Sequence, residues 1–396
     1  MSSIKGKAAI VGIGEIPTGR HADKAAIHYG VASARQAIKD SGIHKDDIDF
    51  VMPTGAVFNG QFNNDLVTCR LVEELGLKNV KTNAQVFAGG ASGSCLVKTA
   101  ASLIASGVAK NVLCVHAEKL GTGLAGGQAG IDLFSTAGIS GEWEVPFGQH
   151  YSTIAALSMT RYMHETGATS EDMAAVCVSN RKWAELNPNA FFRKPLTTEE
   201  VLASKILATP LHAKMSNMLF DGGSAFVMTS ADRAPHLCER PAYLLGESSR
   251  VTHFVHSQEK DITRFGWADA GREAFEEAGL SPSDIDVAEI YDSYPIYQLI
   301  TFEELGFAGR GEGGQMFRNQ ETCPGGRLPV TTNGGMLSQG HTGAGGGVAL
   351  VVEAARQLMN KAGERQVPGA RFAVETGTGG TYMDSQVTIF GTEIPA

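Results

Sequence analysis

Two stretches of the chain share one pattern, in which a helix ends at a glycine and a turn leads into a strand. ASARQAIKDSGIHKDDID (32–49) and AGREAFEEAGLSPSDID (270–286) have Arg, Ala, Gly and Asp-Ile-Asp at matching positions with one constant offset. A glycine directly after the last apolar position is a common helix stop. A repeat this long is no solenoid unit. We interpret it as a duplicated domain with two similar halves, 1–238 and 239–396.

The following elements correspond as well. GGASGSCLVKTAASLIASG (89–107) and GHTGAGGGVALVVEAARQL (340–358) both have a helical pattern, and each precedes a strand, NVLCVHAE or ARFAVETG. The first of these strands is almost entirely apolar, as expected for a strand buried on both faces. Strands that alternate with helices of this length predict a layered α/β fold.

One segment, about 119–212, has no counterpart in the second half. It begins rich in glycine, continues with a helix near 154–165 and ends in NRKWAELNPNAFFRKPLT. Insertions of this kind commonly cover a binding site. We expect a lid or loop region.

The stretch 82–107 predicts a strand end, a glycine-rich turn and a long helix. The N–H groups at such a helix start are unpaired within the helix, and they suit an oxyanion or an activated nucleophile. A turn kept small so that helix and sheet pack closely explains the same residues.

Composition excludes several classes of protein. A net charge of −9 without basic clusters argues against nucleic acid as a partner. No apolar run reaches about 18 residues, so we expect no membrane span. The six cysteines form no C-x-x-C pair, so neither zinc, nor any other metal site, nor a disulfide framework is indicated. The N-terminus lacks a signal-peptide pattern, and we expect a cytoplasmic protein.

Several motifs together resemble the thiolase superfamily, in the branch of sterol-carrier-protein thiolases and lipid-transfer proteins. They are AAIVGIG, VSNRKWAELNPNAFFRKPLT, MLFDGGSAFVMTS, EIYDSYPIYQLITFEELGF, NGGMLSQGHTGAGGG and VETGTGGTYMDSQVTIF. The resemblance covers nearly the whole chain. It implies an α/β fold of five layers, αβαβα, in which each half has a mixed five-stranded sheet, and it implies a homodimer.

Thiolases carry a nucleophilic cysteine at the start of the central helix, in a C-x-S-G pattern. By motif matching this pattern falls on 90–93, so Gly90 takes the cysteine position. The second family cysteine falls on Gly377. Cys95 lies inside the helix, more than a turn from the end where the helix dipole would lower its pKa. We interpret Cys95 as a core residue.

Two other family motifs retain polar groups. The family's N-E-A-F or H-D-x-F motif is Tyr291-Asp292-Ser293-Tyr294 here, and the histidine of G-H-P survives as His341, followed by Thr342. A buried tyrosine and a leftover histidine are the plain alternatives. The resemblance implies substrate-binding roles for Ser92, Asp292, Tyr294 and Gly377.

A site without a thiol favours a changed reaction. Thiolysis requires a nucleophile that holds the acyl group. Retro-aldol cleavage of a β-hydroxyacyl-CoA requires only a base and an oxyanion hole. We expect Tyr291 to be the base, with its pKa lowered by positive dipoles, and His341 to assist. The backbone N–H groups of Gly90 and Gly379 would form the oxyanion hole.

The resemblance to the cysteine-less CoA-ester aldolases, such as the steroid side-chain aldolases, implies a ketone or aldehyde and a short acyl-CoA as products, in lipid, steroid or aromatic catabolism. It also implies no permanently bound cofactor and a small OB-fold, zinc-ribbon partner protein. Two alternatives stay open. One is an acetyl-CoA acyltransferase that uses Cys95, Cys323 or Ser92. The other is a non-catalytic subunit that binds lipid or acyl-CoA.

Overall fold

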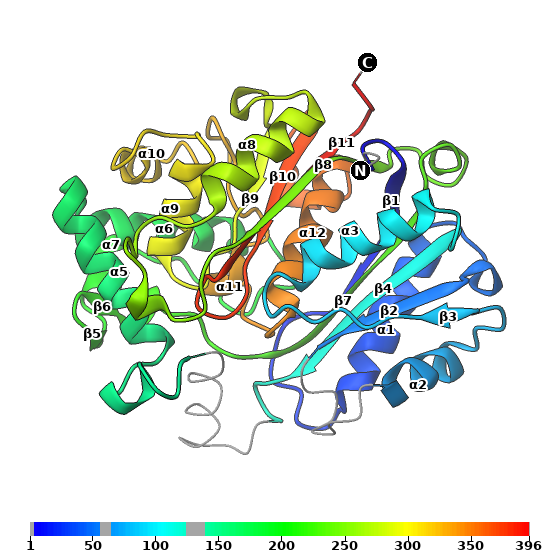
Figure 1. The fold of residues 1–396 in the computed structure, drawn as a ribbon, viewed down its shortest axis with the longest axis horizontal. Coiled ribbons are helices and arrows are strands. Elements are labelled where there is room, and N and C mark those ends of the chain that lie inside the picture. Colours follow the sequence, from blue (N-terminus) through cyan, green and yellow to red (C-terminus); the bar gives the residue numbers. More distant parts are fainter. Residues whose placement is uncertain (1–3, 56–64, 124–138, 396) are drawn as a thin grey trace.

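The computed structural model describes residues 4–55, 65–123 and 139–395. Its main sheet has nine strands in the order β3-β2-β4-β7-β1-β8-β11-β10-β9 (Figure 1). The bounds are β1 Ala8–Glu15, β2 Phe50–Thr54, β3 Thr82–Asn83, β4 Asn111–Lys119, β7 Asp221–Ser230, β8 Ala242–Val251, β9 Val287–Glu289, β10 Phe372–Gly377 and β11 Asp384–Gly391. A separate hairpin pairs β5 (Ile206–Ala208) with β6 (Leu211–His212).

The strand order repeats between the two halves. From the centre outward it is β1-β7-β4-β2-β3 on one side and β8-β11-β10-β9 on the other, and β1 pairs with β8 at the junction. Both sides contain parallel and antiparallel pairs. The expected α/β class with mixed sheets is therefore confirmed. In the described residues the fifth strand of the second half is reduced to a parallel bridge of Val330 with Ala288 of β9, and the two sheets are continuous.

The helices form layers on both sides of the strands. They are α1 Ala26–Asp40, α2 Asp65–Leu75, α3 Ser92–Ala105, α5 Tyr151–Thr166, α6 Ser170–Glu185, α7 Thr198–Leu202, α8 Trp267–Ala278, α9 Pro295–Glu304, α10 Gly313–Arg318, α11 Gly335–Ser338 and α12 Gly345–Leu358. Helices α3 and α12 pack against each other and against strands of both halves, and so form the middle layer (Figure 1). Helix α1 covers β1, β4 and β7, and α8 covers β8 and β11.

Glycine explains why these layers approach so closely. A Cβ on Gly12 would lie 2.3 Å from the Ala37 carbonyl oxygen of α1, and one on Gly14 would lie 2.0 Å from that of Ser33. The repeated helix stops, Gly42 and Gly279, both have a left-handed backbone, with φ of 69° and 71°. The glycine stop inferred from the repeat is thus present after both α1 and α8.

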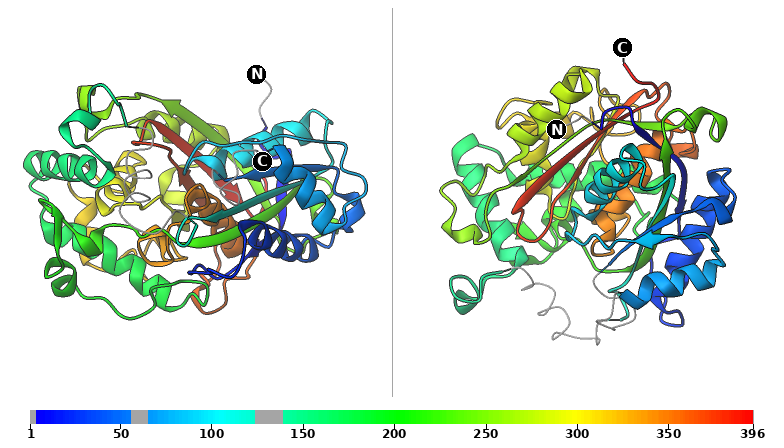
Figure 2. Two further views of the ribbon diagram at one scale, coloured as in Figure 1. Left: turned by 90° about the horizontal axis from the view of Figure 1, so that it is seen from below. Right: turned by 45° about the vertical axis from the view of Figure 1, so that its right-hand side comes forward.

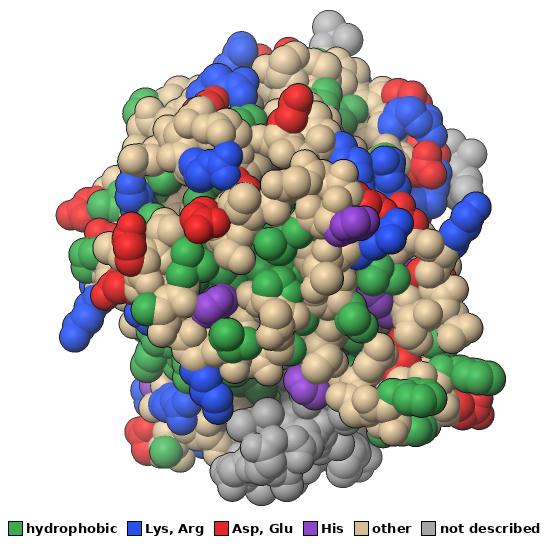
Figure 3. All heavy atoms as spheres, turned by 90° about the vertical axis from the view of Figure 1, so that its left-hand side faces the viewer, with side chains coloured by type: hydrophobic (Ala, Val, Ile, Leu, Met, Phe, Trp, Pro, Cys, Tyr) green, Lys and Arg blue, Asp and Glu red, His purple; other side chains and the backbone are tan. Residues whose placement is uncertain are grey.

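The insertion packs mainly on the second half. Its helix α6 contacts α9, α10 and α11, and α5 contacts α9. Together these elements lie away from α1 and α2 in both views of Figure 2. Figure 3 shows the face of the molecule on this side, with hydrophobic side chains gathered near its middle between separate acidic and basic groups. No helix in the described ranges combines the length and the apolar character that crossing a bilayer requires.

Candidate active site

Three segments meet between the halves: the turn before α3, the turn after β9 and the turn before α12. They bring together Gly90, Tyr291 and His341. The Tyr291 hydroxyl lies 3.2 Å from Nε2 of His341, and a Cβ built on Gly90 would lie only 2.3 Å from that same hydroxyl. Residues far apart in the sequence therefore form one compact group.

Tyr291 is held from both ends. Its backbone N–H donates to Oγ1 of Thr376 on β10 at 3.0 Å, and its ring meets the His341 ring edge-on at 87°. The side chain is buried. Burial raises the pKa of Tyr291 far above its usual value, and the nearby Asp292 carboxylate adds to the rise. The lowered pKa expected from the sequence is wrong, because loss of solvent outweighs any helix dipole.

His341 lies in a turn that is fixed by its backbone. Its N–H donates to the Met218 carbonyl at 3.1 Å, and its own carbonyl accepts the Phe220 N–H at 2.9 Å. Burial lowers the pKa of the imidazole to about 4, and the Glu118 carboxylate opposes this effect. The ring is therefore neutral at neutral pH, with Nε2 facing a phenol that keeps its proton.

Gly90 leaves no room for a side chain. A Cβ at this position would also lie 2.4 Å from the carbonyl oxygen of Thr378. The carbonyl oxygen of Gly90 itself lies so close to α12 that a Cβ on Gly347 would be 2.0 Å from it. Real Cβ atoms do not approach other atoms so closely, so a side chain at either position would displace its neighbours.

The second proposed oxyanion donor is already engaged. The N–H of Gly379 donates to Oδ1 of Asp384 at 2.5 Å, within a turn that Thr378 closes by donating to the Asp384 carbonyl at 2.6 Å. We expected the Gly379 N–H to be free to bind the oxyanion. In this conformation it instead donates to the Asp384 carboxylate. Gly377 permits close packing, since a Cβ there would lie 2.8 Å from Oγ of Ser94.

Two predicted substrate-binding side chains make hydrogen bonds within the protein. Ser92 donates to the Gly89 carbonyl at 2.7 Å and accepts the Ala88 N–H at 3.0 Å, which fixes the turn before α3. Asp292 accepts the N–H of Met336 at 2.8 Å and an amide N–H of Asn180 at 2.7 Å. Burial raises the pKa of Asp292 to about 7. Both residues organise the site's backbone.

Tyr294 joins the insertion to the site. Its hydroxyl lies 3.1 Å from Oγ of Ser152 on α5. Nearby, Tyr382 adopts a left-handed backbone (φ 64°), stacks on Tyr297 and hydrogen-bonds to Ser293. A non-glycine residue with such a backbone is uncommon and is often found at functional sites. Sequence reasoning missed Tyr382, although it stands in the GTGGTYMD motif that supported the resemblance.

The cysteines do not provide a nucleophile at this position. Cys95 lies within α3, and burial raises the pKa of its thiol to about 11. A thiol of this kind is almost entirely protonated at neutral pH. Cys323 is buried. No cluster of metal-ligating side chains occurs in the part of the chain that the structure describes.

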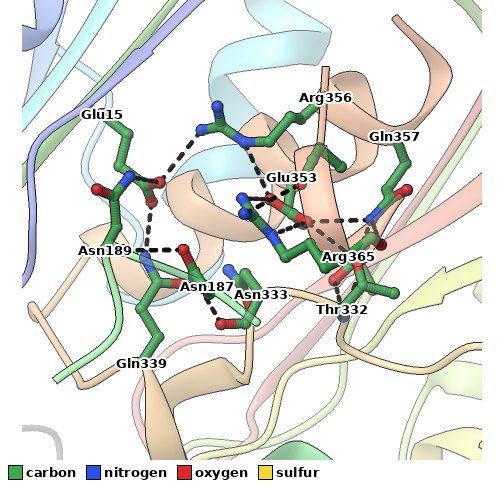
Figure 4. A network of polar contacts seen from close by, with 12 residues as sticks. Glu15, Asn187, Asn189, Thr332, Asn333, Gln339, Glu353, Arg356, Gln357 and Arg365 are labelled. Atoms are coloured by element: carbon green, nitrogen blue, oxygen red, sulfur yellow. Dashed lines mark hydrogen bonds and ion pairs between the residues drawn. The ribbon is translucent and has the colours of Figure 1, made fainter. Parts of the chain in front are cut away.

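A buried ionic network lies beside the site (Figure 4). Glu353 of α12 accepts from Arg365 at 2.8 Å and from Arg356 at 3.0 Å, and Arg356 also reaches Glu15 of β1 at 3.1 Å. Glu15 in turn accepts from Gln339, two residues before His341, at 2.7 Å. The network ties the His341 segment to the first strand of the protein.

Sequence analysis also missed His116 and Glu118 on β4. Both side chains are buried, and Glu118 accepts the Ala344 N–H at 2.7 Å, in the turn between His341 and α12. The sequence feature that could have identified them is a histidine and a carboxylate two residues apart in a largely apolar strand. Alternate residues of a strand share a face, so these two side chains are expected to lie together.

Comparison with known proteins identifies the family. The thiolase C-terminal domain-like family matches residues 248–392. An acetyl-CoA acetyltransferase of Methanothermobacter thermautotrophicus is 30% identical over 96% of this chain and 98% of its own length. The chain therefore belongs to the thiolase superfamily.

Within that superfamily, the chain is similar to aldolases. A steroid side-chain-cleaving aldolase of Thermomonospora curvata is 32% identical over 90% of this chain and 92% of its own. The solved structure described as "Ltp2-ChsH2(DUF35) aldolase" superimposes with a TM-score of 0.85 at 29% identity, and the match covers 98% of both chains. The expected branch of the superfamily is confirmed.

Proposed function

We propose that this protein is an enzyme that cleaves a β-hydroxyacyl-CoA by a retro-aldol reaction, which yields a ketone or aldehyde and a shorter acyl-CoA. The observation that carries the proposal is the Tyr291 hydroxyl, which lies against Gly90 in the family's nucleophile position and 3.2 Å from His341. A phenol there serves proton transfer, whereas a covalent acyl-enzyme would need a nucleophile such as a thiol at this position.

The raised pKa of Tyr291 makes a standing phenolate unfavourable, so the phenol acts as a relay. As the substrate's β-hydroxyl gives its proton to Tyr291, the phenol passes its own proton to Nε2 of the neutral His341. The bond between the α- and β-carbons breaks, its electron pair moves to the α-carbon, and the β-oxygen becomes a carbonyl. The proton on His341 then returns through Tyr291 to the α-carbon. The net change moves one proton from oxygen to carbon and consumes no water.

The thioester enolate needs positive partners while it exists. Gly90 lies directly before Ala91, the N-cap of α3, at the positive end of a helix dipole, and its backbone N–H is the proposed donor. The N–H groups of Ala91 and Ser92 already donate to the carbonyls of Ala88 and Gly89. The protonated His341 adds a charge at the same moment. The Gly379 N–H would contribute only if the Asp384 carboxylate released it.

The substrate is a coenzyme A thioester, and no permanently bound cofactor enters this chemistry. The relative from Thermomonospora curvata is named for steroid side-chain cleavage, which favours a bulky alicyclic acyl group. The solved aldolase structure names two proteins, and we propose that this chain also pairs with a small partner protein. We further propose a homodimer in the cytoplasm.

Thiolysis fits the site less well, although an acetyltransferase is among the relatives. Gly90 holds no thiol, and the raised pKa of Cys95 leaves it unreactive. The deciding experiment incubates the purified protein with a tertiary β-hydroxyacyl-CoA and follows the ketone and the short acyl-CoA by mass spectrometry. Equal amounts of both, formed without free CoA, support the aldolase. A tertiary β-hydroxyacyl-CoA has no β-ketone for a thiol to attack, so a parallel assay offers a β-ketoacyl-CoA together with free CoA, and turnover in that assay alone indicates thiolysis. No turnover of either substrate, with or without a co-expressed partner, indicates a binding subunit.

A further inference from the structure

His116 and Glu118 form a buried pair that the reaction above does not use. They lie on the same face of β4, with exposed fractions of 0% and 1%, and His116 Nε2 is 3.4 Å from Oε2 of Glu118. A buried carboxylate is costly unless hydrogen bonds or positive charge compensate it. Because burying the Glu118 carboxylate costs free energy, we expect it to have a role in the site.

The turn after His341 is built around this pair. Ala344, the N-cap of α12, donates its N–H to Oε2 of Glu118 at 2.7 Å. A Cβ on Gly343 would lie 2.1 Å from the same oxygen, and one on Gly345 would lie 2.0 Å from Cε1 of His116. Only residues without side chains at 343 and 345 let the pair reach this turn. The pair therefore packs directly against the backbone that carries His341.

The pair also acts on the charge of the catalytic groups. The Glu118 carboxylate raises the pKa of His341, whereas burial and His116 lower it. Burial is the main cause of the raised pKa of Tyr291, and after Asp292, Tyr151 and Asp384 the Glu118 carboxylate adds a smaller rise. A negative charge at Glu118 thus favours the protonated imidazole and the neutral phenol, which is the state reached after Tyr291 has passed its proton to His341 and taken one from the substrate.

We propose that Glu118 is a positioning residue for the Tyr291–His341 pair. Its carboxylate fixes the turn 343–345 through the Ala344 N–H and supplies the negative charge that stabilises the imidazolium during the reaction. His116 orients the carboxylate. This assignment rests on the proposed proton relay, and it places a buried charge beside a phenol and an imidazole that are both neutral before the reaction.

The test compares Glu118→Gln with Glu118→Asp. The amide oxygen of glutamine still accepts the Ala344 N–H, so this change removes the charge and retains the hydrogen bond. We expect kcat to fall about 10–100-fold with KM changed less than about threefold, and the acid limb of the kcat/KM profile to move to lower pH. Glu118→Asp retains the charge and should keep the acid limb of the parent protein. The control, Glu304→Gln, alters another carboxylate that accepts a backbone N–H, that of Phe265, and should change neither quantity.

An NMR titration of ¹⁵N-histidine-labelled protein separates this proposal from the proposed function, because it needs no turnover. The His341 signals are identified by their loss in His341→Gln. In Glu118→Gln they should titrate at lower pH than in the parent protein. If His341 titrates at the same pH in both proteins, or if Glu118→Gln lowers only the melting temperature, Glu118 is merely a helix cap and the proposal is wrong. A parent protein that does not cleave the substrate would refute the proposed function, while the titration would still decide the role of Glu118.

Discussion

The hydroxyl of Tyr291 occupies the space that the first side-chain atom of residue 90 would need, since a Cβ on Gly90 would lie 2.3 Å from it. The two positions are therefore coupled: a side chain at 90 excludes the tyrosine in its present place, and the tyrosine excludes a side chain at 90. Glycine at position 90 and tyrosine at position 291 therefore depend on each other.

Replacement of Gly90 by alanine should abolish most activity without unfolding the protein. The added methyl group must displace Tyr291 or the Thr378 carbonyl, and such overpacking typically costs about 1–3 kcal/mol. We expect kcat to fall at least about 100-fold, because the hydroxyl then moves from His341. Gly141→Ala is the matched control, since a Cβ there meets nothing within 4 Å. A Gly90→Ala protein with full activity would show that the contact is not needed.

Replacement of Tyr291 by phenylalanine retains the ring and removes the relay. General acid–base groups typically contribute about 10²–10⁴-fold, so we expect kcat to fall by that amount, with KM little changed. Tyr162→Phe removes another buried hydroxyl, which donates to Glu303 at 2.6 Å, and should leave kcat unaltered. If Tyr291→Phe cleaves as fast as the parent protein, Tyr291 is a core residue and the relay is wrong. His341→Ala should also lower kcat.

Activity should persist in mild acid. Burial lowers the pKa of His341 to about 4. The imidazole can therefore accept a proton above pH 4, and this ability is lost as the pH falls below that value. A histidine with the usual pKa of about 6.5 would be mostly protonated at pH 5. We therefore expect the acid limb of kcat/KM near pH 4, measured with the fold monitored by circular dichroism. An acid limb near pH 6.5 in folded protein would assign the base to another group.

Thiol reagents should leave activity largely intact. The pKa of Cys95 is raised to about 11, so only about one thiol in 10⁴ is ionised at pH 7. Cys95→Ala and iodoacetamide treatment of the parent protein should each retain most turnover. A fall of about 100-fold in Cys95→Ala, with the melting temperature preserved, would favour the acyltransferase alternative.

The buried network should contribute strongly to stability. Glu353 has an exposed fraction of 1% and binds two arginines, which lower its pKa to about 2. Removal of one partner from a buried ion pair typically costs about 3–5 kcal/mol. We expect that loss in the free energy of unfolding of Glu353→Ala, measured with urea. Arg272→Ala, which breaks exposed ion pairs with Asp269, Glu273 and Glu276, should cost less than about 1 kcal/mol.

Motif spacing predicted the residues that meet, but not their electrostatics. Gly90 and His341 could be placed because motifs mark helix starts. The predicted lowering of the Tyr291 pKa was wrong because the sequence indicates a helix dipole but does not show how deeply the side chain is buried. The prediction of a free donor at Gly379 was wrong because a turn brings the Asp384 carboxylate back to accept that N–H. His116 and Glu118 were missed because a mostly apolar strand indicates core. The fifth strand of the second half is shortened to a single bridge between Val330 and Ala288, which follows the helices α9 and α10.

The network in Figure 4 also bears on how the molecule unfolds. Asn189 of the insertion donates to Glu15 at 2.9 Å, and Asn187 donates to the Asn333 carbonyl at 2.8 Å. The insertion is thus attached to β1 by a half-buried hydrogen bond and to the segment before His341 by a buried one. Opening it alone would leave these buried groups without partners, so the insertion and both halves should exchange amide hydrogens and melt as one cooperative unit.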